Sequence, residues 1–397
     1  MKKINFDKII HREKTLSTKF DGRQAYFGNS DVLPLWVADM DFEVPESVQL
    51  ALQKQISHAV FGYSFYPESL YQSIVDWFAL QHQWQIEREW ILMVPGVVPS
   101  LYATVLATTQ ENDGVIIQSP VYFPFFSAVT HNHRRLVINK LQNHNGHYQI
   151  DFDDLEKCAQ QGAKLLMLCT PHNPVGRVWN PPELRKILEI SRRYNLTILS
   201  DDIHCDLIYS NYQHTMLQTL AKPEDKIVTA IAPSKTFNIP GLGLSALVVP
   251  DADIRSSIKN EFGKLHVTNQ NPLSIIAFEA AYRGGDDWLR QLLIYLEANC
   301  DFVIDFLQKN IPKISAKKPE ATYLIWLDCR NLHMSDAELR RFFIEDCNLG
   351  LNPGAVFGEG GSGFMRLNIG TRRELIAQAL QQIKDGISRL NPNDYCI

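Results

Sequence analysis

Short apolar runs alternate with amphipathic segments between about residue 90 and residue 250, and this alternation constrains the fold more than any other feature. Six runs are continuous in apolar residues and do not alternate with polar ones: 90–94, 114–118, 164–169, 196–200, 226–232 and 245–249. Such runs are typical of parallel strands covered on both faces. The intervening segment 181–195 begins with prolines, carries Glu183 in its first turn and repeats apolar residues at helical spacing. The sequence therefore predicts βαβ units and an α/β fold with a mainly parallel sheet.

The last third of the chain follows a different pattern. We expect helices at 286–310, 335–347 and 373–389, and strand-like stretches at 321–329 and 364–370. We expect a smaller α+β domain over residues 286–397, after a large domain over residues 46–285. Residues 1–45 are expected to join the small domain or to lie across the interface. A chain of 397 residues is long enough for two such domains.

Composition excludes several classes of protein. The net charge of −5 gives no electrostatic reason to expect nucleic acid or an anionic membrane as a partner. The first residues, MKKINFDKIIHREK, lack the apolar core of a secretory signal, and no apolar run reaches the roughly 18 residues of a membrane span. The seven cysteines are scattered and form no C-x-x-C pair. A reduced, cytoplasmic protein is the expected class.

The residues that follow each apolar run are candidate site residues, because ligands of parallel sheets bind at the carboxyl ends of the strands. The first run is followed by a glycine turn and a helix, whose first N–H groups around Gly96, Val97 and Val98 would form an anion site. The later runs lead to an aromatic ring, an amide, a carboxylate, a hydroxyl and an amine: Tyr122, Asn173, Asp201, Ser234 and Lys235.

Each of these side chains has a simpler explanation when taken alone. Tyr122 could be a core aromatic, Asn173 a turn residue and Asp201 a helix cap, and Lys235 could be a solvated strand end. Their order, with each one at the end of a strand, predicts a shared site instead. Pyridoxal phosphate chemistry needs this set. A lysine forms an imine with its aldehyde, a carboxylate keeps its ring nitrogen protonated, and a helix N-terminus binds its phosphate.

The stretches around these residues resemble fold-type I pyridoxal phosphate enzymes, and specifically the MalY/PatB cystathionine β-lyase family. The matches extend over nearly the whole chain and include LPLWVADMDFEVP (33–45), VFGYS (60–64), CTPHNPVGRVW (169–179), SDDIHCDLIY (200–209), APSKTFNIPGL (232–242) and GFMRLNIG (363–370). The resemblance implies a large domain with a mainly parallel seven-stranded sheet flanked by helices, and a smaller α+β domain.

The resemblance also implies a role for each matching residue. Lys235 matches the imine-forming lysine, Asp201 the partner of the ring nitrogen and Tyr122 the stacking aromatic. Asn173 matches the donor to the ring oxygen, and it also lies at the substrate. Arg366 matches the arginine that binds the substrate α-carboxylate, a bidentate task that suits a guanidinium group.

Other matching residues concern the cofactor phosphate and the subunit interface. The matches to phosphate contacts are Gly96, Val97, Val98 and Ser234. Tyr63 resembles a tyrosine that reaches the phosphate of the neighbouring subunit. His204 stands where many relatives carry a tyrosine near the ring oxygen. Position 243 is a glycine, where wider-family aminotransferases often place an arginine on the phosphate.

The family resemblance implies a cytoplasmic, homodimeric carbon–sulfur β-lyase with composite active sites. It would use pyridoxal 5′-phosphate to cleave L-cystathionine or related cysteine S-conjugates to a thiol such as homocysteine, pyruvate and ammonia. Two alternatives stay open: an aminotransferase with the same residues, and a lyase with a second role in binding a transcriptional regulator.

The stretch DDIHCD (201–206) offers possible metal ligands, but strand residues alternate between faces and no second ligand cluster accompanies it, so no metal is expected.

Overall fold

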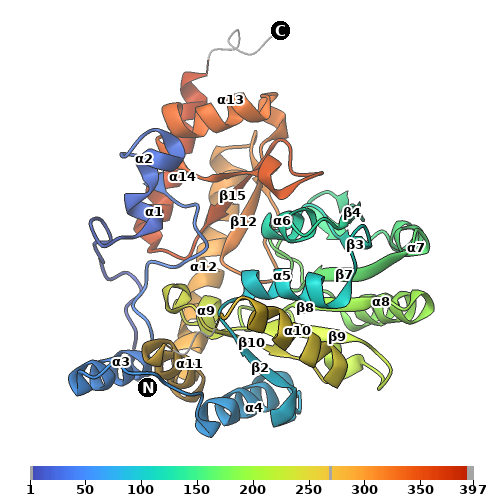
Figure 1. The fold of residues 1–397 in the computed structure, drawn as a ribbon. Coiled ribbons are helices and arrows are strands. Elements are labelled where there is room, and N and C mark those ends of the chain that lie inside the picture. Colours follow the sequence, from blue (N-terminus) through green and yellow to red (C-terminus); the bar gives the residue numbers. More distant parts are fainter. Residues whose placement is uncertain (1–2, 268–270, 391–397) are drawn as a thin grey trace.

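The computed structural model describes residues 3–267 and 271–390, and its centre is a seven-stranded sheet (Figure 1). Across the sheet the strands are β2 (Ile91–Val94), β10 (Ser245–Val248), β9 (Ile227–Ile231), β8 (Thr197–Asp201), β7 (Ala163–Cys169), β3 (Gly114–Ile117) and β4 (Arg135–Ile138). The six predicted strands are all present, and β4 is the seventh. The predicted seven-stranded, mainly parallel sheet is therefore confirmed.

One strand departs from the expected direction. β10 pairs antiparallel with both β2 and β9, whereas the remaining pairs of the sheet are parallel. All residues of β10 are nevertheless buried. A continuous apolar run therefore reports burial on both faces of a strand, and not the direction in which the strand runs.

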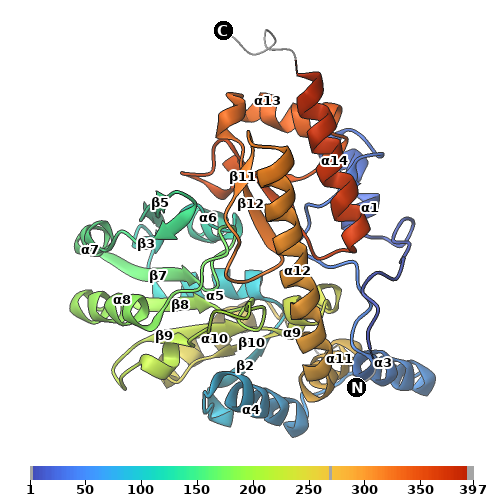
Figure 2. The ribbon, with the colours of Figure 1, turned by 180° about the vertical axis from the view of Figure 1, so that it is seen from behind.

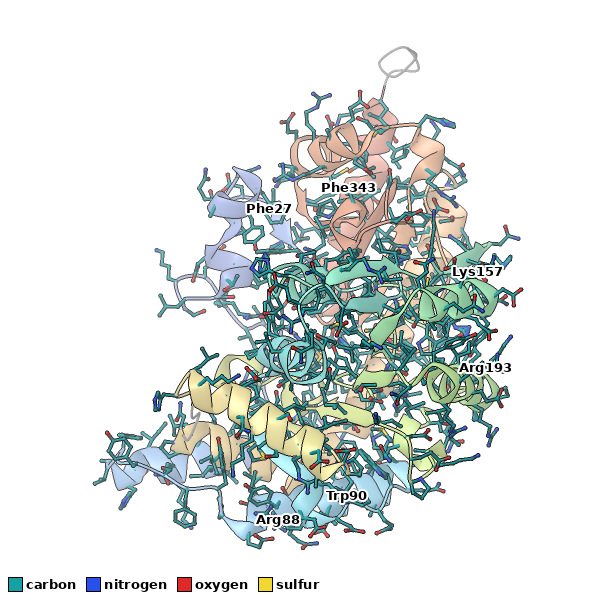
Figure 3. All side chains as sticks on the ribbon, turned by 45° about the vertical axis from the view of Figure 1, so that its right-hand side comes forward. Phe27, Arg88, Trp90, Lys157, Arg193 and Phe343 are labelled. Atoms are coloured by element: carbon teal, nitrogen blue, oxygen red, sulfur yellow. The ribbon has the colours of Figure 1, made fainter. Side chains whose placement is uncertain are left out.

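Helices cover both faces of this sheet (Figures 1 and 2). Alternate residues of β7 separate the two sides: Leu165 and Met167 pack with α5 (Val97–Thr108), α6 (Pro124–Thr130) and α10 (Ala252–Lys264). Leu166 and Leu168 pack with α7 (Phe152–Gln160) and α8 (Pro181–Tyr194), whose charged residues Lys157 and Arg193 lie at the outer side of the molecule (Figure 3). The two-sided cover explains why the strands read as unbroken apolar runs.

A second, four-stranded antiparallel sheet lies beside the first. Its strands, in order, are β11 (Ser315–Ala316), β12 (Leu324–Asp328), β15 (Phe364–Asn368) and β14 (Asn352–Pro353). The predicted helices at 286–310 and 373–389 are α12 (Asp286–Asn310) and α14 (Arg373–Arg389), which pack together. The predicted helical stretch 335–347 is α13 (Asp336–Arg341) followed by a π-helical turn. The domain boundaries at residues 45 and 285 stay a prediction.

The other α-helices and strands belong to neither of these two sheets. They are α1 (Thr18–Asp21), α2 (Arg23–Phe27), β1 (Leu33–Pro34), α3 (Glu46–His58), α4 (Glu68–His82), β5 (Gln142–His144), β6 (His147–Gln149), α9 (Pro233–Thr236), α11 (Pro272–Gly284) and β13 (Leu349–Gly350). β1 pairs with β13, whereas α3 packs against α11. None of the helices in the described parts of the chain is long and apolar enough to cross a bilayer.

A buried ion cluster anchors residues 36–42, which we call the strap. Lys19 is fully buried, and its ammonium lies 3.0 Å from Asp41 and 3.7 Å from Asp39. The guanidinium of Arg12 lies 2.8 Å from Asp39 and 2.7 Å from Asp41. Two cations and two anions thus balance one another and hold the strap through Asp39 and Asp41.

Replacing Lys19 should therefore destabilise the protein. Lys19→Met removes one cation of the cluster, and the free energy of unfolding should fall by about 3 kcal/mol, since breaking a buried ion pair leaves charge uncompensated. Urea denaturation measures this loss. The exposed Lys54 provides the control, because Lys54→Met should change stability by less than about 0.5 kcal/mol. Equal effects of the two substitutions would contradict a structural role for the cluster.

Candidate active site

A cavity of about 280 Å³ lies at the carboxyl ends of β2, β7, β8 and β9. It gathers most of the residues predicted from the sequence, namely Gly96, Val97, Val98, Tyr122, Asn173, Asp201, His204, Ser234 and Lys235. Arg366 does not line this cavity but contacts Asn173 at its edge. Tyr63 lies outside the cavity with a fully exposed side chain. The sheet topology therefore brings together side chains that are up to about 140 positions apart in the sequence.

The N-terminus of α5 forms one wall of the cavity. Gly96 precedes this 12-residue helix and provides no side-chain cap, so the N–H groups of Val97 and Val98 have no capping oxygen. Pro99 follows them and has no N–H group to satisfy. Unpaired N–H groups and the positive end of the helix dipole favour an anion here, and Ser234 adds a hydroxyl to the same cavity.

Lys235 extends from α9, directly after β9. Its ammonium donates a hydrogen bond to the backbone oxygen of Ala38, at 2.6 Å. Burial lowers the pKa of Lys235 to about 8, and Arg366 acts in the same direction, whereas Asp39 and Asp201 oppose them. An amine with this pKa is partly neutral near physiological pH, as a nucleophile or a general base must be.

Asp201 ends β8 and is almost fully buried. Its carboxylate accepts a hydrogen bond from the backbone N–H of Ile203 at 3.3 Å. Burial raises the pKa of Asp201 to about 7, helped by the neighbouring charge of Asp202, while Lys235 opposes the shift. The carboxylate is thus held without enough positive charge around it, and a cationic partner in the cavity would stabilise its ionised form.

His204 lies three positions after Asp201, in the turn that follows β8, and lines the same cavity. Burial lowers its pKa to about 3, and the charges of Lys235 and Arg366 act in the same direction, so the imidazole is neutral. Its Nδ1 atom is buried and has no hydrogen-bond partner in the described parts of the chain. Asp202, in contrast, turns away from the cavity and accepts a hydrogen bond from His214 at 2.8 Å. This orientation is the one expected from strand alternation.

Arg366 is buried on β15 without a counter-charge. Its guanidinium donates to the side-chain oxygen of Asn173 at 3.1 Å, to the backbone oxygen of Trp36 at 2.9 Å and to Asn352 at 2.6 Å. Its Nε atom has no hydrogen-bond partner, and no carboxylate of a described residue forms an ion pair with the Arg366 guanidinium. Arg177, equally buried, is paired with Glu183 at 3.0 Å. Burial lowers the pKa of Arg366 to about 10. A buried arginine in this state is prepared for an incoming carboxylate.

Tyr122 lines the same cavity as Asp201. The backbone N–H of Tyr122 donates a hydrogen bond to the backbone oxygen of Asn173, at 3.1 Å. Burial raises the pKa of the Tyr122 phenol, so the ring is uncharged. An uncharged aromatic ring at this place offers a flat surface on which a planar ligand can stack.

Sequence reasoning missed the contribution of the strap. The backbone oxygen of Ala38 accepts from Lys235 and also from the hydroxyl of Tyr323, at 2.9 Å. The stretch LPLWVADMDFEVP contributes to the family resemblance, but every residue has a backbone oxygen, so no sequence pattern marks the oxygen of Ala38. Two residues of the DDIHCD stretch, Cys205 and Asp206, lie with His82 in a group whose possible ligand atoms are within 4.8 Å of one another. The carboxylate of Asp206 accepts hydrogen bonds from Trp77, His82 and Thr236.

Comparison with known proteins identifies the family. Residues 30–383 match the aminotransferase class I and II family. The chain is 40% identical to cystathionine beta-lyase PatB of Bacillus subtilis, over 97% of this chain and 100% of PatB. The chain belongs to this family. It is also 30% identical to protein MalY of Escherichia coli, over 97% of this chain and 99% of MalY.

Solved structures of this family agree in fold. Cystalysin from Treponema denticola, whose crystal structure contains a pyridoxal 5′-phosphate cofactor, superposes with a TM-score of 0.95 and is 36% identical, over 98% of this chain and 99% of cystalysin. A pyridoxal phosphate-bound putative aminotransferase from Clostridium difficile has a TM-score of 0.95 at 39% identity, covering 97% of this chain and all of that one. The fold is therefore that of fold-type I pyridoxal phosphate enzymes.

The burial of Asp201 predicts a pH-dependent stability in the cofactor-free protein. Its pKa of about 7 lies above the ordinary 3.8, so the folded state holds the proton more tightly, and stability is lost as the pH rises through this window. Asp201→Asn removes the titration. The variant should match the wild type below about pH 4 and exceed its unfolding free energy above pH 7, by on the order of 2–4 kcal/mol.

Urea denaturation of cofactor-free protein at several pH values measures this difference. The exposed Asp253 on α10 gives the control, because Asp253→Asn should show no gain that grows with pH. A constant difference between wild type and Asp201→Asn at all pH values would show that the burial of Asp201 does not penalise its charge.

Proposed function

We propose that this protein is a pyridoxal phosphate-dependent carbon–sulfur β-lyase. It cleaves L-cystathionine and related cysteine S-conjugates to a thiol such as homocysteine, pyruvate and ammonia. The similarity to PatB over the full length of both proteins supports this reaction. The observation that carries the proposal is Arg366, a buried arginine without a counter-charge beside the Lys235 cavity, since it would pair with the α-carboxylate of an amino-acid substrate.

The residues of the cavity fit pyridoxal phosphate. The uncapped N-terminus of α5 and Ser234 would hold the phosphate, and Tyr122 would stack on the ring. Asp201 would face the ring nitrogen, whose positive charge offsets the cost of burying this carboxylate. Asn173 and His204 would lie on the ring-oxygen side. When bound, the cofactor supplies an aldehyde that reacts with amines and a ring that takes up the electron pair left by a departing proton.

Lys235 and Arg366 divide the work on the substrate. Arg366 would bind the α-carboxylate and so orient the Cα–H bond for its removal. The amine of Lys235, with its lowered pKa, would accept the Cα proton as the general base. The thiolate would then leave from Cβ with the electrons of the C–S bond. Hydrolysis of the remaining three-carbon unit gives pyruvate and ammonia.

We further propose a homodimer with composite active sites. An exposed apolar stretch follows α3 and includes Val60, Phe61, Tyr63 and Phe65, with exposed fractions of 62%, 57%, 109% and 77%. A contiguous apolar surface of this kind is typical of a protein interface. A second copy of the chain would cover it, and Tyr63 would reach the phosphate site of that copy.

A cytoplasmic location is also proposed. All six cysteines in the described parts of the chain are buried free thiols. Burial raises the pKa of Cys169 and Cys205 well above the ordinary value, so these thiols stay protonated. Thiols without disulfide partners suit a reducing compartment.

The product ratio with L-cystathionine tests the reaction. The holoenzyme should release pyruvate and homocysteine in equal amounts, because a thiolate leaves readily once the Cα proton is gone. Lys235→Ala should lose this activity by at least about a thousandfold, as expected when the base is removed. Stoichiometric accumulation of pyridoxamine phosphate, with turnover restored by added keto acids, would show an aminotransferase instead.

Hybrid dimers test the composite site. Lys235→Ala and Tyr63→Ala should each be nearly inactive alone, because the first lacks the base and the second lacks a partner contact. After mixing and subunit exchange, each hybrid should contain one site with both residues intact and regain activity. Subunit exchange is followed with two differently tagged chains. Confirmed exchange without recovered activity would contradict the role of Tyr63 across the interface.

A further inference from the structure

The strap, residues 36–42, joins the two cations of the active site. The backbone oxygen of Ala38 accepts from the ammonium of Lys235 at 2.6 Å. Two residues earlier, the backbone oxygen of Trp36 accepts from the guanidinium of Arg366 at 2.9 Å. Lys235 belongs to the large sheet's side of the site, whereas Arg366 lies on β15 of the second sheet. One short length of backbone therefore contacts both groups that the proposed reaction needs.

Asn238 fastens the strap to the Lys235 side. It lies three residues after Lys235, and its side chain makes three hydrogen bonds to the strap. Its side-chain oxygen accepts from the N–H of Met40 at 2.9 Å, and its amide nitrogen donates to the oxygens of Met40 and Phe42 at 2.9 and 2.8 Å. Its backbone is left-handed, with φ of 58°, a conformation that asparagine tolerates better than most residues. Its position on the chain thus lets one side chain connect the lysine turn to the strap.

Asn368 fastens the strap to the Arg366 side in a similar way. It lies two residues after Arg366 on β15 and is fully buried. Its amide nitrogen donates to the backbone oxygens of Val37 and Asp39, at 2.6 and 2.7 Å. Its side-chain oxygen accepts from the N–H of Gly370 at 2.7 Å, which fixes the orientation of the amide. Both asparagines therefore use the amide nitrogen as a donor and the side-chain oxygen as an acceptor. Each lies within three positions of a residue of the proposed reaction.

We propose that the strap couples the position of Lys235 to that of Arg366, with Asn238 and Asn368 as its positioning residues. The inference rests on the proposed function, since it assigns a shared support to the base and the carboxylate-binding group of that reaction. Proton removal requires the base and the bound carboxylate in a fixed mutual geometry, and misplacement by about 1 Å can cost on the order of a hundredfold in rate. A strap held at both sides provides this geometry across two sheets.

Hydrogen exchange in the cofactor-free protein tests the coupling without any activity. The N–H of Met40 is held by Asn238, and the N–H of Gly370 is held by Asn368. In Asn368→Ala, exchange should accelerate roughly tenfold at Met40 as well as at Gly370, because the loosened strap no longer presents Met40 to Asn238. In Asn238→Gly, exchange should likewise accelerate at Gly370. Acceleration confined to the amide that lost its own partner would overturn the coupling.

A matched control separates coupling from general loosening. Asn195, an exposed residue with φ of 52° at the end of α8, has the same left-handed backbone as Asn238. Asn195→Gly should leave exchange at Met40 and Gly370 unchanged. If Asn368→Ala does not fold, Asn368→Ser takes its place, since a hydroxyl keeps one polar group at the site. Equal acceleration in the Asn195 control would overturn the assignment to the strap.

Steady-state kinetics of the holoenzyme with L-cystathionine then test both positioning roles. Asn238→Gly and Asn368→Ala should each lower kcat and raise KM, because each disturbs both Lys235 and Arg366. The double variant should lose much less than the product of the two single losses, since the first loosening already releases the strap. Multiplicative losses, or an effect of each variant on one constant alone, would overturn the coupling. If the wild type shows no lyase turnover, the proposed reaction fails, and the exchange experiment still decides the coupling.

Discussion

The hydrogen bonds from the half-buried Lys235 and the buried Arg366 to backbone oxygens of the strap are the interactions on which the rest of the site depends. Lys235 and Arg366 donate to the backbone oxygens of Ala38 and Trp36, and no carboxylate pairs with Arg366 in the described parts of the chain. A carbonyl dipole satisfies a donor without neutralising its charge. The positive charge of Arg366 therefore stays available for a substrate carboxylate.

The acidic residues of the strap have other partners. Asp39 and Asp41 both contact Arg12 and Lys19. If these carboxylates pointed toward Arg366, they would compete with the substrate. The acidic side chains of the strap thus belong to a balanced ion cluster, whereas its backbone contacts Arg366, which has no carboxylate partner among the described residues. The cluster stabilises the fold, whereas Arg366 keeps a charge with which an anionic ligand can pair.

Burial disfavours the charged form of several side chains in the cavity. Burial raises the pKa of Asp201 to about 7, lowers that of Lys235 to about 8 and lowers that of His204 to about 3. A stable core would not collect groups that are each displaced from their ordinary ionisation. Such clusters are characteristic of functional sites, where a bound cofactor and substrate supply the missing charges. The apolar cores on the two faces of the large sheet stabilise the fold and offset the free energy lost at these groups.

The sequence by itself determined the sheet and the residues at its strand ends. Lys235, Asp201, Asn173 and Tyr122 could be found because each follows a continuous apolar run, and parallel strands bring their carboxyl ends to one edge. The direction of β10 could not be found, since burial produces the same apolar run in either direction. The assignment of Arg366 came only from the family resemblance, because nothing local distinguishes an arginine on a buried strand as a ligand for a carboxylate.

Only the tertiary structure decided what holds these residues in place. The contact of Lys235 with Ala38 spans 197 positions, and the contact of Arg366 with Trp36 spans 330. Both use backbone oxygens, which every residue has, so no pattern of side chains marks them in advance. The roles of Asn238 and Asn368 depend on the same long-range geometry. Sequence patterns report periodicity and local chemistry, whereas these contacts exist only after the two sheets and the strap have come together.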